Sequence, residues 1–193
     1  LFNVIAGDRT LVTDILTHPG IDAISFVGST PVAHIVQDTG VAHGKRVQAL
    51  GGANNHAIVM PDADVEFAAQ HISAGAFGAA GQRCMALPVI VAVGGVEEKL
   101  VPAIKARAEK IVVGPGTDPA SEMGPVITRS SQERITKWID EAEAKGANIV
   151  LDGRGYRPEG EEYADGFWLA PTIIDNVDRD LSVYCEEVFG RVL

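Results

Sequence analysis

The sequence has little cysteine, few aromatic residues and no long hydrophobic run. Only two cysteines, Cys84 and Cys185, occur among 193 residues. Two are too few for a disulfide framework and fit a reducing intracellular setting better. Apolar runs such as residues 87–93 are much too short to span a bilayer, so we expect a soluble protein. Neither a CxxC nor an HxxxH pair occurs, so the sequence predicts no metal site.

Basic residues are also scarce, with 16 against 26 acidic residues and a formal net charge of −10. Nucleic acid and anionic membranes would be repelled, so we expect neither as a partner. The hydrophobic content of 46% excludes disorder and suffices for one ordinary domain or parts of two. The chain begins at Leu1 without a signal-peptide pattern and ends abruptly after Val192, so we expect an internal fragment.

Strand-like runs alternate with helical patterns along the chain, which predicts an α/β fold with parallel strand pairing. We expect strands at residues 2–5, 23–27, 45–50, 57–60, 88–93, 147–151 and 167–174. We expect helices at residues 8–18, behind Pro31, and at 65–77, 96–110 and 129–145. In the helix behind Pro31, the apolar residues Val32, Ile35 and Val36 are expected to face inward. A boundary between two domains is expected near residues 48–55.

The sharpest candidate for chemistry is Gly81-Gln82-Arg83-Cys84, at the end of a helix rich in small residues. A thiol is a nucleophile only as the thiolate, and an adjacent cation lowers its pKa. Glycines at positions 75, 78 and 81 would let backbone or substrate approach closely. A buried structural cysteine explains the pattern equally well. Cys185 precedes two glutamates, which should raise its thiol pKa, so it is the weaker candidate.

Two further signals could belong to a nucleotide site. Gly28-Ser29-Thr30 closes an apolar strand and opens a helix, where backbone N–H groups and the helix dipole can receive phosphate. An ordinary capped turn gives the same pattern. Glu187 could bind ribose hydroxyls or could lie on a solvated face. The usual GxGxxG dinucleotide fingerprint is missing.

Together these motifs resemble the aldehyde dehydrogenase superfamily over the whole chain. Residues 26–30 (FVGST) are similar to its nicotinamide-side phosphate turn, and residues 81–84 (GQRC) to its nucleophile motif. Residues 187–190 (EVFG) are similar to its ribose-binding loop. The resemblance implies an α/β, parallel-sheet fold, with the C-terminal part of an NAD-binding domain in residues 1–52. Residues 53–193 would form the catalytic domain, truncated at its C-terminus.

Departures from the family pattern narrow the resemblance. The family's glutamate before Leu-Gly-Gly activates water to hydrolyse a thioester, and here Ala49 takes its place. Because alanine accepts no proton, a deacylating nucleophile other than water is implied. The phrase around Ala49, with Arg83-Cys84-Met85-Ala86, resembles the CoA-acylating methylmalonate-semialdehyde dehydrogenases. In that family an arginine beside the nucleophile holds the substrate carboxylate, a role suited to a bidentate guanidinium. Arg191 also replaces the usual proline, and Asn54 a common lysine.

The resemblance implies NAD-dependent oxidation of malonate or methylmalonate semialdehyde, with coenzyme A as co-substrate and loss of CO2. It assigns nucleophilic attack to Cys84, carboxylate binding to Arg83, and cofactor binding to Gly28, Ser29, Glu187 and Phe189. A homo-oligomer in a bacterial cytoplasm or a mitochondrial matrix is implied for the full-length enzyme. Two alternatives stay open: a hydrolytic NAD-dependent aldehyde dehydrogenase that releases a carboxylate, and a non-catalytic α/β relic or assembly module.

Overall fold

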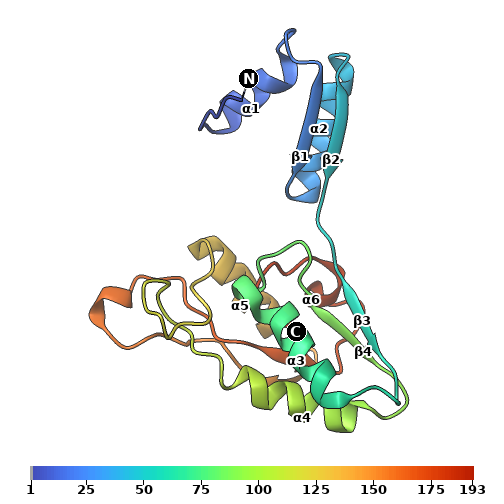
Figure 1. The fold of residues 1–193 in the computed structure, drawn as a ribbon, viewed down its shortest axis with the longest axis vertical. Helices are drawn as coiled ribbons and strands as arrows, with labels where there is room; N and C mark the ends of the chain where they lie inside the picture. Colours follow the sequence, from blue (N-terminus) through green and yellow to red (C-terminus); the bar gives the residue numbers. More distant parts are fainter. Residues whose placement is uncertain (1) are drawn as a thin grey trace. The chain divides into compact units, whose positions relative to one another are not determined.

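The computed structural model describes residues 2–193, and the chain divides into two compact units, Leu1–Gly52 and Ala53–Leu193. Each unit contains helices and short paired strands (Figure 1). In the described part of the chain, no helix has the length and apolar character needed to cross a membrane. The two units are described separately below.

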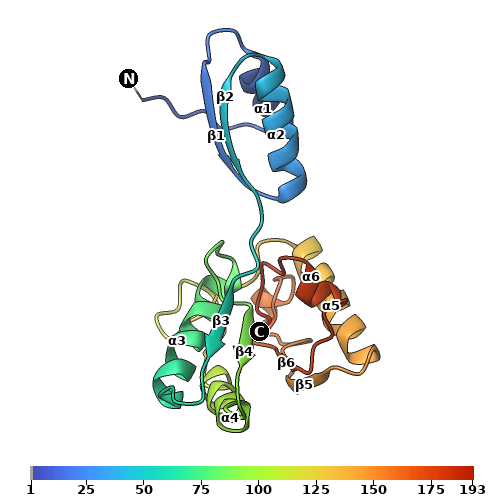
Figure 2. The same cartoon turned by 90° about the vertical axis from the view of Figure 1, so that its right-hand side faces the viewer.

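The first unit contains a two-stranded parallel sheet with α2 packed along it (Figures 1 and 2). β1 (Ala23–Val27) pairs in parallel with β2 (Arg46–Leu50), and α2 (Thr30–Ala42) connects them. α1 (Arg9–Thr17) precedes β1, and the Asp8 carboxylate caps it by accepting the Thr10 N–H at 2.9 Å. The predicted helix at residues 8–18 and both strands are therefore confirmed, with boundaries shifted by about one residue.

One expectation for this unit was wrong, and a second was right only for Val36. Residues 2–5 form no strand, and their apolar side chains are exposed because no neighbouring strand pairs with them. In α2 the buried face consists of Ala33, Val36 and Gly40, while Val32 and Ile35 are 40% and 55% exposed. This face consists mainly of small residues because the helix lies very close to β2. A Cβ on Gly40 would stand 2.6 Å from the Val47 side chain.

The first half of the second unit is a parallel strand pair covered by two helices. β3 (His56–Val59) pairs with β4 (Val89–Ala92), α3 (Val65–Phe77) follows β3, and α4 (Glu97–Ala108) follows β4. The Asp64 carboxylate caps α3 by accepting the Phe67 N–H at 3.0 Å. One apolar cluster joins the two helices to β3 and includes the fully buried Ala69 and Leu100.

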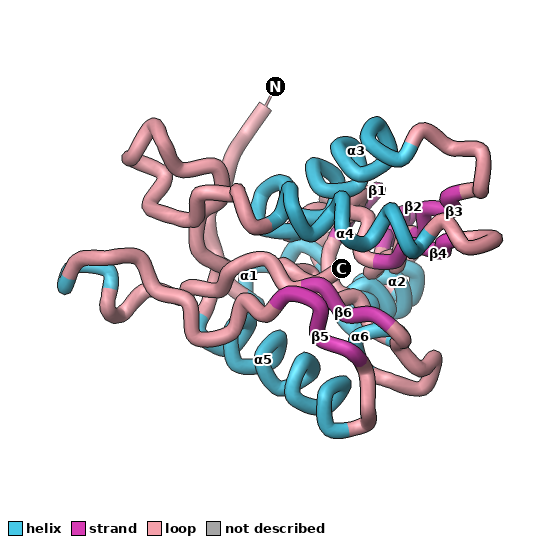
Figure 3. The backbone as a smooth tube through the Cα atoms, turned by 90° about the horizontal axis from the view of Figure 1, so that it is seen from below, coloured by secondary structure: helices cyan, strands magenta, loops and turns pink. Residues whose placement is uncertain are grey.

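The second half packs α5 (Arg129–Ala144) along β5 (Asn148–Leu151) and β6 (Ile173–Asp175), as Figure 3 shows. A short helix, α6 (Ser182–Cys185), precedes the C-terminal loop. The predicted strand over residues 167–174 was wrong in extent, because only residues 173–175 pair with β5, and they do so antiparallel. The backbone N–H groups of Thr172 and Ile174 donate to the carbonyls of residues 191 and 193, each at 2.8 Å. Parallel pairing therefore holds for the first two strand pairs and not for the third.

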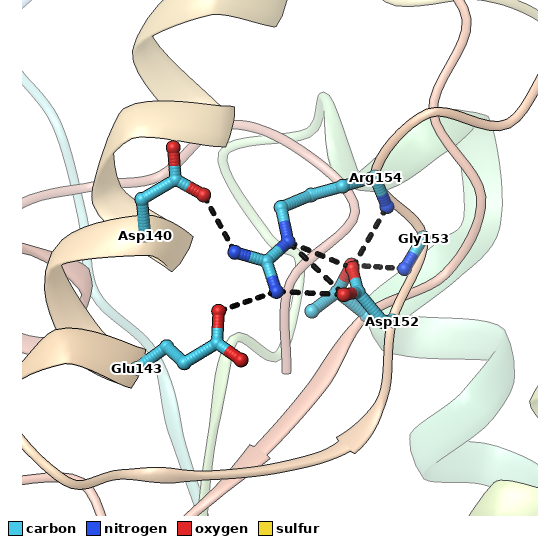
Figure 4. Close-up of polar contacts among 6 residues, drawn as sticks. Asp140, Glu143, Asp152, Gly153 and Arg154 are labelled. Atoms are coloured by element: carbon cyan, nitrogen blue, oxygen red, sulfur yellow. Dashed lines mark hydrogen bonds and ion pairs between the residues drawn. The ribbon is translucent and has the colours of Figure 1, made fainter.

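One arginine ties α5 to the end of β5 (Figure 4). The Arg154 guanidinium contacts the carboxylates of Asp140 at 2.5 Å and Glu143 at 2.7 Å on α5. It also contacts Asp152 at 2.6 Å, just after β5. The hydrogen bonds from Arg154 to Asp152 hold the pKa of the Asp152 carboxyl below its ordinary value. The three carboxylates are largely exposed, so this ion-pair network supports the fold modestly.

Candidate active site

The candidate nucleophile lies on a turn beyond the end of α3. The helix ends at Phe77, and a single 3-10 turn, Gly78–Gly81, follows it. Ala79 and Ala80 both adopt left-handed backbone conformations, with φ of 50° and 58°, and Gly81 continues with φ of 68°. A left-handed alanine costs about 1 kcal/mol or more, and such strain collects at functional sites. Residues 82–84 therefore lie outside the helix, which ends at Phe77 as the predicted range 65–77 has it.

Cys84 is exposed on a tight turn that is fastened to the start of β3. The Ala86 N–H donates to the Arg83 carbonyl at 3.0 Å, which closes the turn. The Asn55 amide donates to the carbonyls of Cys84 and Ala86, at 2.9 and 2.8 Å. The exposure of Cys84 argues against a buried structural cysteine. The sequence offered no signal for Asn55, since a single asparagine before a strand has many uses.

The glycines near the turn provide the close approach that the sequence predicts. A Cβ on Gly78 would lie 2.9 Å from Nη1 of Arg83, so the guanidinium rests against this position. A Cβ on Gly81 would overlap the carbonyl oxygen of Gly190. A Cβ on Gly75 would lie 3.0 Å from Cδ1 of Leu87. Small residues at the end of α3 therefore leave room for Arg83 and for the C-terminal loop.

A small hollow beside the turn brings together several of the predicted site residues. Arg83, Glu187 and Phe189 all line it, and Gly81 and Gly190 form part of its wall. Cys84 directly follows the lining residue Arg83 in the sequence but does not itself line the hollow. The remaining lining residues are Ala53, Ala76, Ala86 and Pro88. Three of the predicted site residues, Arg83, Glu187 and Phe189, therefore meet at one hollow of the second unit, and the predicted nucleophile is the next residue after Arg83.

The carboxylate of Glu187 is partly buried in this region. Burial raises its pKa, while the Ala53 N–H and the positive charge of Arg134 act in the opposite direction. Arg134 anchors the loop from α5: its guanidinium donates to the Val188 carbonyl at 2.9 Å and stacks 4.7 Å from the centre of the Trp138 ring. Glu187 therefore sits in a fixed, half-desolvated position that suits an acceptor for hydroxyl groups.

The first unit presents Gly28 and Ser29 at the start of α2. The Gly28 N–H donates to the Leu50 carbonyl at 3.1 Å, and the Thr30 hydroxyl accepts the Gly52 N–H at 3.0 Å. Ser29 is the N-cap residue, and its hydroxyl makes no capping hydrogen bond. This exposed hydroxyl and the first free N–H groups of a 13-residue helix can donate hydrogen bonds to the oxygens of a phosphate. These donors therefore fit the pyrophosphate of a dinucleotide.

Arg191, the residue that replaces a family proline, is buried directly after Gly190. It is 1% exposed, and among residues 2–193 none of its three guanidinium nitrogens has a hydrogen-bond partner. Burial lowers the pKa of Arg191 to about 10, although the nearby Tyr156 counteracts this.

Among residues 2–193, no group of three or more His, Cys, Asp or Glu side chains is arranged to hold a metal ion.

Comparison with known proteins agrees with this geometry. The model of the aldehyde dehydrogenase family matches residues 1–193. The chain belongs to the aldehyde dehydrogenase family. The fold expected from the sequence is confirmed as well. A Sinorhizobium meliloti 1021 protein assigned as a methylmalonate-semialdehyde dehydrogenase, solved as a complex with NAD, superposes with a TM-score of 0.93 at 43% identity. That match covers 97% of this chain and 38% of the other.

Two curated members of the aldehyde dehydrogenase family are similar over essentially the whole chain. Malonate-semialdehyde dehydrogenase 1 of Oceanobacillus iheyensis is 44% identical over 193 residues, which is 100% of this chain and 39% of the relative. The mitochondrial, acylating methylmalonate-semialdehyde/malonate-semialdehyde dehydrogenase of Bos taurus is 45% identical, over 99% of this chain and 35% of its own length. This chain therefore spans well under half the length of the relatives it matches.

Proposed function

We propose that this chain supplies the nucleophile and part of the NAD site of a CoA-acylating malonate- or methylmalonate-semialdehyde dehydrogenase. The observation that carries the proposal is the exposed Cys84, on a tight turn that follows the strained residues 79–81 and lies beside a hollow lined by Arg83, Glu187 and Phe189. The names of the similar proteins support the substrate class and, for the bovine relative, acylation. In this proposal residues 1–52 belong to the NAD-binding domain and residues 53–193 to the catalytic domain.

In the proposed reaction the Cys84 thiolate attacks the aldehyde carbon and forms a thiohemiacetal. Arg83 binds the carboxylate at the far end of the substrate, because its planar guanidinium matches that group in charge and shape. We assign stabilisation of the developing oxyanion to the Cys84 backbone N–H. NAD, when bound, would supply the acceptor for the hydride that the thiohemiacetal loses as it becomes a thioester. We assign its contacts to Gly28 and Ser29 in the first unit and to Glu187 and Phe189 in the second.

The acyl group then leaves Cys84 by thiolysis. Ala49 lies half-buried on β2 and cannot take a proton from water, which supports coenzyme A as the acceptor. The CoA sulfur forms a new thioester bond, the bond to the Cys84 sulfur breaks, and Cys84 departs as the thiolate. Overall, the semialdehyde, NAD and the CoA thiol give acetyl-CoA or propionyl-CoA, CO2 and NADH: the bond from the substrate carboxylate to its neighbouring carbon breaks, and the proton released by the CoA thiol takes its place on that carbon.

The test uses the natural gene product that contains these residues, assayed for NADH formation from malonate semialdehyde with and without CoA. CoA-dependent turnover that yields acetyl-CoA supports the proposal. Cys84→Ala should abolish it, whereas Cys185→Ala, the matched change at the other exposed thiol, should not. Equal turnover without CoA, giving a free acid, would replace thiolysis by the hydrolytic alternative. No NADH in either reaction would favour the non-catalytic relic.

Arg83 is tested separately through substrate specificity. Arg83→Met should raise the KM for malonate semialdehyde at least about tenfold, because a charge-assisted, bidentate contact contributes roughly 1.5–3 kcal/mol. An aldehyde without a carboxylate, such as propanal, should keep its KM. Equal losses for both aldehydes would show that Arg83 supports the turn and does not recognise the carboxylate.

A further inference from the structure

We call residues 78–86, which lead from the end of α3 through Cys84, the nucleophile turn. Its backbone touches the backbone of the loop at residues 187–190. A Cβ added to Gly81 would overlap the Gly190 carbonyl oxygen and would stand 3.0 Å from the Ala76 carbonyl oxygen. Gly81 also has a φ of 68°, a conformation that other residues rarely adopt. We call this contact the Gly81–Gly190 seam. It leaves no room for any side chain between the two segments.

The 187–190 loop is supported on its other side by α5. A Cβ on Gly190 would overlap Cδ1 of Ile135, a fully buried residue of that helix. The adjacent Arg134 holds the Val188 carbonyl at 2.9 Å. The loop is thus enclosed between α5 and the nucleophile turn, and a displacement on one side must be transmitted to the other, because packed interiors do not deform continuously.

Backbone strain concentrates on both sides of the seam. Among the described residues, four non-glycine residues have a positive φ, and three of them, Ala79, Ala80 and Phe189, flank this contact. Each costs about 1 kcal/mol or more and persists only where surrounding contacts impose it. Strain of this kind on both segments indicates that each depends on the other for its conformation.

We propose that the Gly81–Gly190 seam couples the 187–190 loop to the Cys84 turn, so that the position of the loop sets the reactivity of the Cys84 thiol. Gly81 and Gly190 are positioning residues in this scheme. The inference deepens the proposed function, in which the loop contacts NAD and the thiol attacks the aldehyde. The coupling itself is a property of the chain and needs neither NAD nor substrate.

The experiment measures the rate of Cys84 alkylation by iodoacetamide in the natural gene product, by mass spectrometry of the peptide that contains Cys84. Ile135→Val removes only the Cδ1 atom that backs Gly190, far along the chain from Cys84. Ile139→Val makes the same change at a fully buried position of α5 that is not among the nearest contacts of Gly190. We expect Ile135→Val to change the alkylation rate about threefold or more, a coupling typical of residues in contact, and Ile139→Val to change it less than twofold.

Gly81→Ala breaks the seam directly and completes the test. Its matched control is Gly155→Ala, which carries the same left-handed penalty, with φ of 73°, but has open space around it. Gly81→Ala should alter the alkylation rate strongly, and Ile135→Val should have no further effect in that background. Should Gly81→Ala fail to fold, as judged by circular dichroism, the comparison of Ile135→Val with Ile139→Val decides the matter alone.

Equal alkylation rates in Ile135→Val, Ile139→Val and the parent protein would overturn the coupling. So would a Gly81→Ala protein that behaves like Gly155→Ala. Failure of the proposed function is visible separately: NADH formation would be absent and added NAD would leave the alkylation rate unchanged in every variant. The coupling would still be measured in that case, because alkylation requires no cofactor.

Discussion

Arg191 gives the sharpest prediction on stability. Its guanidinium is buried and unpaired among the described residues, so replacing it with an apolar side chain of similar length should stabilise the protein. Methionine suits the replacement because it is unbranched and adapts to irregular apolar space. The change Arg191→Met therefore removes a desolvated charge while leaving the volume filled.

The size of the effect follows from the titration of the group. Burial lowers the pKa of Arg191 to about 10, from an ordinary value above 12. Each pH unit of displacement corresponds to about 1.4 kcal/mol, so carrying the charged form into the folded state costs about 3 kcal/mol. Since the folded-state pKa lies below the unfolded one, this cost is fully present below pH 10. It diminishes only as the pH rises above that value.

The assay compares the thermal unfolding of Arg191→Met with that of the parent protein at pH 6, 7.5 and 9. We expect the variant to gain about 3 kcal/mol, or roughly 10 °C in Tm, by the same amount at all three pH values. Arg179→Met, at an exposed arginine, is the matched control and should change the Tm by no more than about 1–2 °C. A lower Tm for Arg191→Met would refute the reasoning, because it would show that the guanidinium has a stabilising partner.

Three further results follow from the site and its supports. Asn55→Ala removes both hydrogen bonds to the turn, so it should lower the free energy of unfolding by about 1–3 kcal/mol and alter the Cys84 alkylation rate. Asn148→Ala, at an exposed strand end, is the control. Arg154→Met should destabilise the protein by about 1 kcal/mol in urea unfolding, and by less at high salt. The difference between variant and parent should vanish as the pH falls through the lowered pKa of Asp152. Glu187→Gln should raise the Tm slightly at pH 7, because burial raises the pKa of this carboxyl, and the gain should disappear in acid once the glutamic acid is protonated.

The parts of the fold that were predictable depend on local chemistry. Asp64 accepts an N–H of the first turn of α3, and Gly146, with φ of 93°, follows the end of α5. Both signals act within a few residues, so sequence alone suffices to locate these helix ends. Strands behave differently, because their extent depends on a partner. The apolar run at residues 2–5 has no partner strand and forms no strand. The run at residues 167–174 pairs only beyond Pro171, where β5 and the C-terminal residues provide partners.

The same distinction separates the site residues from their supports. Arg83 and Cys84 were recognisable because a nucleophile and its neighbouring cation are adjacent in sequence. Asn55, which holds the turn from 29 residues away, carries no local signature. Left-handed Ala79 and Ala80 even contradict local preference, since isolated alanines avoid this conformation and only tertiary contacts impose it. A motif therefore identifies the groups that can react, whereas their precise placement depends on distant backbone contacts, above all the Gly81–Gly190 seam. Substitutions at the seam should accordingly affect Cys84 more than their distance from it in the sequence suggests.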